Sequence, residues 1–71
     1  MTYREAARRL RKMGCIEWPR RSGGSHRKWY NPATRRMVVL PDWGSRDLKT
    51  GTLRAAFSQL GMEWSEFESI N

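Results

Sequence analysis

The sequence predicts an α+β domain with one helix, three antiparallel strands and a second helix, in the order α-β-β-β-α. Two observations carry this prediction. Apolar residues recur at helical spacing near both ends of the chain, and between them lie three short segments rich in β-branched and aromatic residues. Because the turns between these segments are short, we expect an antiparallel meander with both helices on one face of the sheet and the other face open.

The first helix is expected over residues 3–13. Thr2 and Glu5 have the spacing of a capping box, in which each side chain binds the free backbone amide of the other residue. Gly14 suits the left-handed conformation that commonly follows the last helical turn. The apolar stripe expected to face the sheet consists of Tyr3, Ala6, Ala7, Leu10 and Met13.

The three strands are expected at residues 15–20, 26–30 and 36–40, with turns over 22–25 and 31–34. Each strand is rich in aromatic or β-branched residues, and each turn is rich in residues that favour turns. Short turns of this kind join neighbouring strands of an antiparallel sheet. The strand at 26–30 should therefore be the central one.

The central strand places its side chains alternately on the two faces of the sheet. His26, Lys28 and Tyr30 should share one face, whereas Arg27 and Trp29 should lie on the other. Since Trp29 is the largest apolar side chain of the strand, we expect its face to be the buried one. His26 and Lys28 should then lie together on the open face.

A second helix is expected over residues 50–60, with Thr50 as its cap and Gly61 after its last turn. Residues 65–68 repeat the spacing of a capping box, which predicts a last short helical turn through Ile70. The apolar stripe of the second helix consists of Leu53, Ala56, Phe57 and Leu60.

The charge of the chain is positive and unevenly distributed. The net charge is +7, and a chain of this length is expected to form a single domain over residues 1–71. Residues 1–36 carry eleven Lys or Arg against two Glu, whereas residues 37–71 carry three against five acidic residues. Concentrated basicity indicates an acidic partner, first of all nucleic acid, although a generally cationic surface would give similar counts.

Other features disfavour several classes of protein. A lone Cys15 forms neither a disulfide framework nor a thiolate metal cluster, and it is typical of a small buried residue in a reduced, cytoplasmic protein. The acidic residues lie mainly in the less basic half without a metal-ligand motif, so we expect no metal and no cofactor. The longest aliphatic run, residues 37–40, is too short to span a bilayer, and we expect no membrane partner.

The strongest candidate site is the run Gly-Gly-Ser-His-Arg-Lys-Trp-Tyr at residues 23–30. His26 is the only histidine, and histidine is the side chain that most readily exchanges a proton near neutral pH. An ordinary surface histidine would fit the same position. Lys28 is the first candidate for a phosphate contact because it shares a face with His26, and Arg27 ranks below it. The remaining candidates are Gly24 and Ser25 in the turn, with Arg20, Arg21, Arg35 and Arg36 for flanking phosphates.

Six segments occur together in one ordered set. They are the helix ending at Gly14, Gly24-Ser25-His26, Val38-Val39-Leu40-Pro41, residues 47–54, residues 59–62, and Glu66-Phe67. The triplet alone would be a weak signal, but the ordered set is specific. With it, the chain resembles the HicA toxins of bacterial toxin–antitoxin systems, which are small ribonucleases that cleave mRNA.

This resemblance implies a fold like that of a double-stranded-RNA-binding domain. It implies a metal-independent endoribonuclease that cleaves mRNA and so inhibits translation, with His26 as general acid or base. It also implies a HicB-like antitoxin that covers the active face of the toxin. For a basic domain of this size, we expect a monomer alone or a hetero-oligomer with that antitoxin. The sequence departs from the family at Trp43, where many members carry a second histidine.

The tryptophans have two interpretations. Exposed aromatic rings can stack on unpaired bases, but in a small domain they also cover the core. We expect Trp29 in the core, whereas Trp18 fits either interpretation. Trp43 and Trp64 lie near loops and could contact RNA or the antitoxin, and packing is expected for most of the four.

Two other functions fit the same features. A non-catalytic RNA-binding module would have the same fold and charge, and the basic first helix would suit a helix-based DNA-binding protein. His26 separates these hypotheses. A binding module should tolerate replacement of this residue, because its phosphate contacts come from Arg and Lys, whereas a nuclease should keep binding and lose cleavage.

Overall fold

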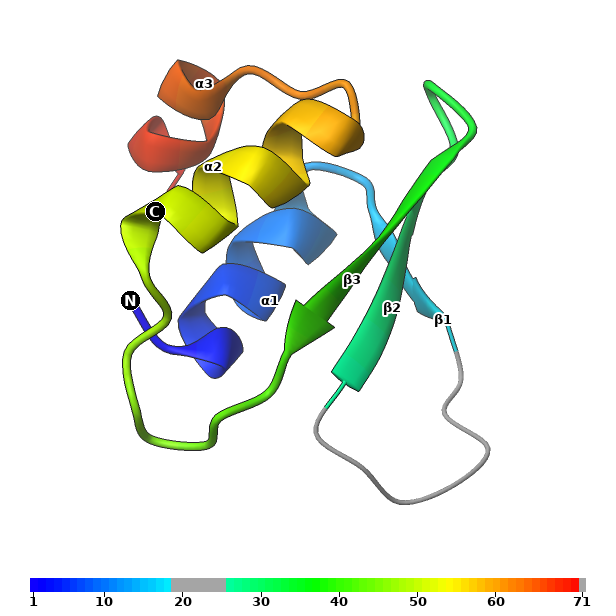
Figure 1. Cartoon of the computed structure of the whole chain (residues 1–71). Helices are drawn as coiled ribbons and strands as arrows, with labels where there is room; N and C mark the ends of the chain where they lie inside the picture. The colour runs from blue at the N-terminus through cyan, green and yellow to red at the C-terminus, as the bar shows by residue number, and fades with distance from the viewer. Residues whose placement is uncertain (19–25, 71) are drawn as a thin grey trace.

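The computed structural model describes residues 1–18 and 26–70. Its helices and strands follow one another as α1 (Tyr3–Lys12), β1 (Ile16–Trp18), β2 (His26–Asn31), β3 (Arg36–Pro41), α2 (Thr50–Gln59) and α3 (Trp64–Ser69). The predicted α+β class and the order of the elements are confirmed (Figure 1). In the described part of the chain, no helix has the length and apolar character needed to cross a bilayer.

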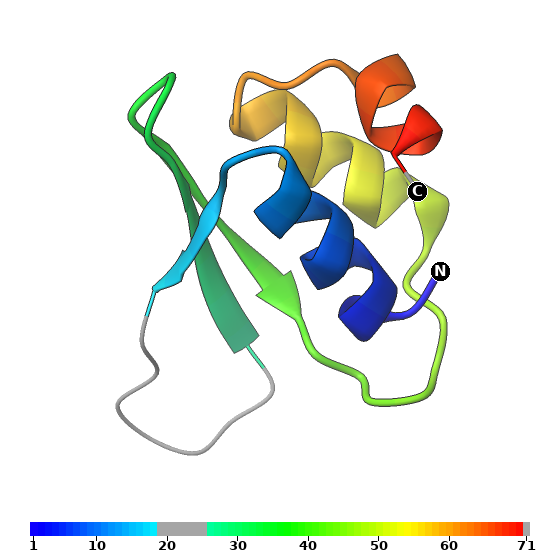
Figure 2. The ribbon, with the colours of Figure 1, turned by 180° about the vertical axis from the view of Figure 1, so that it is seen from behind.

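The three strands form an antiparallel sheet in the order β1-β2-β3, with β2 in the centre. All three helices lie on one side of this sheet, as the two opposite views show (Figures 1 and 2). The expected meander, with helices on one face only, is therefore confirmed. The other face of the sheet is not covered by any described element.

Helix α1 begins and ends close to the predicted residues. The Oγ1 of Thr2 accepts a hydrogen bond from the Glu5 amide at 3.3 Å, and Gly14 follows the helix with a φ of +93°. The second half of the expected capping box is wrong, because the Glu5 carboxylate accepts hydrogen bonds from the side chains of Arg8 and Arg9 instead. These two cations lie one turn along the helix, where an i, i+3 or i, i+4 pair forms readily.

The starts of the two later helices differ from the prediction. Lys49 is the N-cap of α2 and makes no side-chain capping bond, so Thr50 is the first helical residue and not the cap. Helix α3 begins at Trp64, one residue before the expected capping-box serine, Ser65. The Trp64 ring lies 5.6 Å from that of Phe57 and 5.3 Å from that of Phe67. This aromatic packing explains why helix α3 already includes Trp64.

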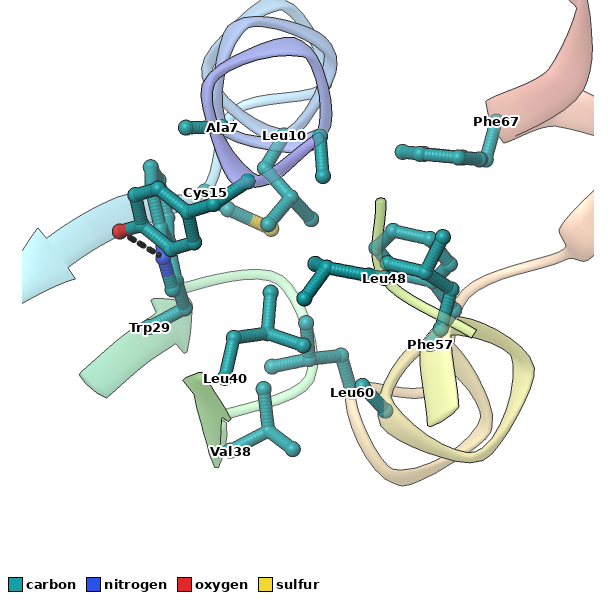
Figure 3. Packing of buried hydrophobic residues seen from close by; sticks show 14 residues of the cluster. Ala7, Leu10, Cys15, Trp29, Val38, Leu40, Leu48, Phe57, Leu60 and Phe67 are labelled. Carbon is teal, nitrogen blue, oxygen red and sulfur yellow. Dashed lines mark hydrogen bonds between the residues drawn. The ribbon is translucent and has the colours of Figure 1, made fainter. Parts of the chain in front are cut away.

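The core fills the space between the sheet and the helices (Figure 3). Trp29, from the centre of β2, is completely buried, as predicted. The cluster draws on every helix, on β2 and β3, and on three residues between elements, Cys15, Leu48 and Leu60. Cys15 is buried as expected, and its burial raises the pKa of the thiol. The buried residues of the three helices are Tyr3, Ala6, Ala7, Leu10, Leu53, Ala56, Phe57 and Phe67.

The turn between β2 and β3 is fastened to the end of α2. The Leu60 carbonyl accepts hydrogen bonds from Asn31 Nδ2 at 2.8 Å and from Thr34 Oγ1 at 2.7 Å. The next residue, Gly61, has a φ of +73°, and a Cβ there would lie 2.8 Å from Thr34 Cγ2. The glycine therefore meets two requirements at once, a left-handed backbone and close approach of the turn.

Gly61→Ala should destabilise the fold more than Gly14→Ala does. Both glycines have positive φ, so both substitutions incur the left-handed backbone penalty of roughly 1 kcal/mol. Only at Gly61 must a neighbour also move, because nothing lies within 4 Å of a Cβ at Gly14. We expect Gly61→Ala to lose at least about 1 kcal/mol more free energy of unfolding in urea titrations. Equal losses would contradict this close packing of the turn on α2.

Candidate active site

The open side of the sheet, which we call the outer face, consists of the strand side chains that point away from the helices. The strand register puts them in three rows. Side chains directly opposite one another in an antiparallel pair lie on the same face. The rows are Ile16, Tyr30 and Met37, then Trp18, Lys28 and Val39, and finally His26 and Pro41.

His26 and Lys28 lie on the outer face, as predicted. His26 is the first residue of β2 and is paired with Pro41, the last residue of β3. Lys28 follows two residues later, about 7 Å along the strand, and both side chains are exposed. The only acidic residue within the three described strands is Glu17, and it lies on the helix side of the sheet. His26 and Lys28 therefore share a surface to which these strands contribute no carboxylate.

The outer face also exposes large apolar side chains. Ile16, Trp18, Met37 and Val39 are each between 44% and 52% exposed. Trp18 packs its ring against Tyr30, with centroids 6.1 Å apart and ring planes at 66°. Of the four tryptophans, Trp29 and Trp64 pack as core residues, whereas Trp18 and Trp43 remain about half exposed. Packing thus accounts for only two of the four, fewer than expected.

Arg27 points to the opposite side of the sheet from its neighbours His26 and Lys28. Its guanidinium donates to Glu17 Oε2 at 3.0 Å and lies 3.2 Å from Asp42 Oδ2. Glu17 is on β1 and Asp42 directly follows β3, so Arg27 connects the two strands that flank the start of β2. Its Nε is buried without a hydrogen-bond partner. This arrangement fixes the backbone from which the His26 side chain projects.

Tyr3 extends the Arg27 cluster to helix α1. Its hydroxyl donates to Glu17 Oε1 at 2.6 Å and accepts from Trp29 Nε1 at 3.0 Å, the bond drawn in Figure 3. Burial, followed by the hydrogen bond to Glu17, raises the pKa of Tyr3. The phenol therefore stays protonated and serves as a link between the helix and the strands. A cleft of about 560 Å³ opens beside this cluster, lined by Tyr3, Glu17, Arg27 and Asp42 among others.

The sequence did not predict this cluster. Glu17 could have been suspected, because alternation in the strand puts it on the face opposite Ile16 and Trp18, where a lone carboxylate needs a cation. No local signal in the sequence identifies Asp42 as a member of the cluster, because its position beside Arg27 depends on how far β3 extends along β2.

The other residues predicted to contact phosphate either lie far from His26 or fall outside the described residues. Arg35 lies in the β2–β3 turn with a φ of +59°, and Arg36 begins β3 opposite Asn31. Both are at the end of the hairpin away from His26, roughly 17 Å along the strands. Four predicted contacts, Arg20, Arg21, Gly24 and Ser25, lie outside the described residues.

Helix α1 carries a second group of cations that is partly neutralised. Arg8 and then Arg9 bind the Glu5 carboxylate and lower its pKa to about 2. Arg11 lies 3.5 Å from Glu17 and over the ring of Trp29. Within the described residues, no three His, Cys, Asp or Glu side chains are grouped to hold a metal ion.

Arg27→Gln should destabilise the fold, whereas Lys28→Gln should not. The first change leaves two partly buried carboxylates without their shared cation, for which we expect a loss of about 1–3 kcal/mol. The second removes an exposed side chain of the adjacent residue and should stay within about 0.5 kcal/mol. Urea unfolding of both variants measures the difference. If Arg27→Gln is as stable as Lys28→Gln, the link between β1 and β3 contributes nothing.

Comparison with known proteins assigns the chain to a family. Searches of curated proteins and of solved structures found no match. The family model described as the HicA toxin of bacterial toxin–antitoxin systems matches residues 3–62 of the 71-residue chain. That match covers α1, the sheet and α2, including the outer face with His26 and Lys28. The chain therefore belongs to the HicA toxin family.

Proposed function

We propose that this protein is an endoribonuclease toxin that cleaves mRNA without a metal ion, and that His26 transfers a proton in the reaction. One observation supports the proposal most strongly. In a chain of the HicA family, the only histidine is exposed on an open sheet face beside a lysine. An open face suits a polymeric substrate better than a small molecule, which would need a deep pocket.

The chemistry follows from the structure of RNA. The 2′-hydroxyl oxygen forms a bond to the adjacent phosphorus while the bond from phosphorus to the 5′-oxygen breaks. The 2′-hydroxyl gives up a proton, and the leaving 5′-oxygen takes one. His26 performs one of these two transfers, and Lys28, Tyr30 or solvent performs the other. The Lys28 ammonium stabilises the additional negative charge on the phosphorane.

The other basic residues have secondary roles in this proposal. Arg35 and Arg36, at the far end of the hairpin, hold phosphates several nucleotides from the cleaved bond. Arg20 and Arg21 hold flanking phosphates. Gly24 and Ser25 let the RNA backbone approach His26. Arg27 contributes by holding the start of β2, since its guanidinium already binds Glu17 and Asp42.

The partner of the toxin is a HicB-like antitoxin in the cytoplasm, which blocks activity by covering the outer face. The exposed apolar side chains of this face support a protein interface, because monomeric proteins seldom expose large contiguous apolar patches. The alternative function is an RNA-binding module of the same fold without catalysis. The family match and the exposed position of His26 favour the enzyme.

His26→Ala should slow cleavage strongly and leave RNA binding nearly unchanged. Loss of one proton transfer typically slows a reaction about 10²–10⁴-fold, whereas phosphate binding depends chiefly on Arg and Lys. The measurement is cleavage of a labelled single-stranded mRNA in EDTA, with binding of the same RNA followed by anisotropy at several salt concentrations. Lys28→Gln is the matched comparison and should weaken binding as well as cleavage.

Three results would count against this mechanism. Equal cleavage by the parent and His26→Ala would remove His26 from the reaction. Cleavage by the parent only when a divalent metal is added would contradict the metal-independent route. Salt-sensitive binding without cleavage by either protein would favour the RNA-binding module.

A further inference from the structure

The outer face holds an exposed aromatic side chain next to the proposed catalytic pair. Trp18 is directly opposite Lys28 in the β1–β2 register, and His26 is its diagonal neighbour one row away. Diagonal neighbours in an antiparallel pair are about 7–8 Å apart. A nucleotide with its phosphate at His26 and Lys28 therefore has an aromatic ring within reach of its base.

The Trp18 ring is held by a contact that leaves it accessible. It meets Tyr30 at 66°, an edge-to-face arrangement, and not as a parallel stack. Such a contact orients the rings without covering both faces of each. Trp18 remains 49% exposed and lies among other exposed apolar side chains of the outer face, and apolar patches of this kind mark interaction sites.

The charges of this surface suit an RNA strand. Trp18 is opposite a lysine, and the described strands place no carboxylate on the outer face. A phosphate approaching Trp18 and Lys28 thus meets a cation and no like charge from these strands. By contrast, Arg8 and Arg9 of α1 share the Glu5 carboxylate, which offsets part of their positive charge.

We propose that Trp18, supported by Tyr30, stacks on an unpaired base adjoining the phosphate held at His26 and Lys28, and so selects single-stranded RNA. The inference rests on the proposed function for the position of the phosphate. An RNA duplex keeps its bases stacked on one another, so they are not free to stack on the Trp18 ring. Trp18 is accordingly a substrate-binding residue that determines which RNA is accepted.

The test is binding of a fluorescent single-stranded 2′-O-methyl oligonucleotide, which has no free 2′-hydroxyl and cannot be cleaved by the proposed route. Trp18→Leu keeps apolar bulk but removes the aromatic ring, and it should weaken binding roughly 5- to 150-fold. Trp18→Phe keeps a ring and should recover most of the affinity. An abasic oligonucleotide of the same length keeps the phosphates, and the parent and Trp18→Leu should bind it equally.

The outcomes separate this inference from the proposed function. Equal binding of the base-bearing oligonucleotide by the parent and Trp18→Leu would overturn the stacking role and leave the aromatic pair to the antitoxin interface. The stacking role would also be overturned if Trp18→Leu lost as much affinity for the abasic oligonucleotide as for the base-bearing one, because the loss would then not depend on the base. Both results would leave His26-dependent cleavage intact. If the parent protein showed the expected binding pattern but cleaved no RNA, the proposed nuclease function would be wrong and the stacking role of Trp18 would stand.

Discussion

Burial of Trp29 is the constraint on which the rest of this structure depends. The ring is completely buried and donates its indole hydrogen bond to Tyr3 of α1. Because side chains alternate along a strand, this one burial fixes the orientation of every other residue of β2. His26 and Lys28 must then lie on the outer face. A shift of one residue would expose the tryptophan and turn the histidine toward the core.

The same alternation separates the charges of the sheet. Arg27 points inward, where Glu17 and Asp42 bind it, whereas Lys28 points outward to a face without a strand carboxylate. The neighbouring cations therefore have different roles, one stabilising the fold and one available to a ligand. The net charge of +7 describes the chain as a whole. In our proposal, the functional surface is the outer face, where Lys28 has no strand carboxylate beside it.

Much of this arrangement could be predicted from the sequence, for physical reasons that also set the limits. The alternation of β2 and the stripe of α1 are local periodicities, so the position of His26 beside Lys28 followed directly from them. The caps at Thr50 and Ser65 were wrong because short polar motifs occur at several nearby positions, and packing decides among them. The Arg27 cluster was missed because it joins β1, β2 and the residue after β3. Such a cluster depends on the register between strands, which the sequence of one strand does not specify.

The central claim is that the outer face binds RNA, and NMR titration tests it most directly. The uniformly ¹⁵N-labelled protein would be titrated with an uncleavable single-stranded 2′-O-methyl oligonucleotide. We predict that the amide signals of His26 and Lys28 and the indole signal of Trp18 shift most. Shifts confined to the exposed side of α1, around Arg4 and Arg8, would contradict the claim and move the RNA to the helices.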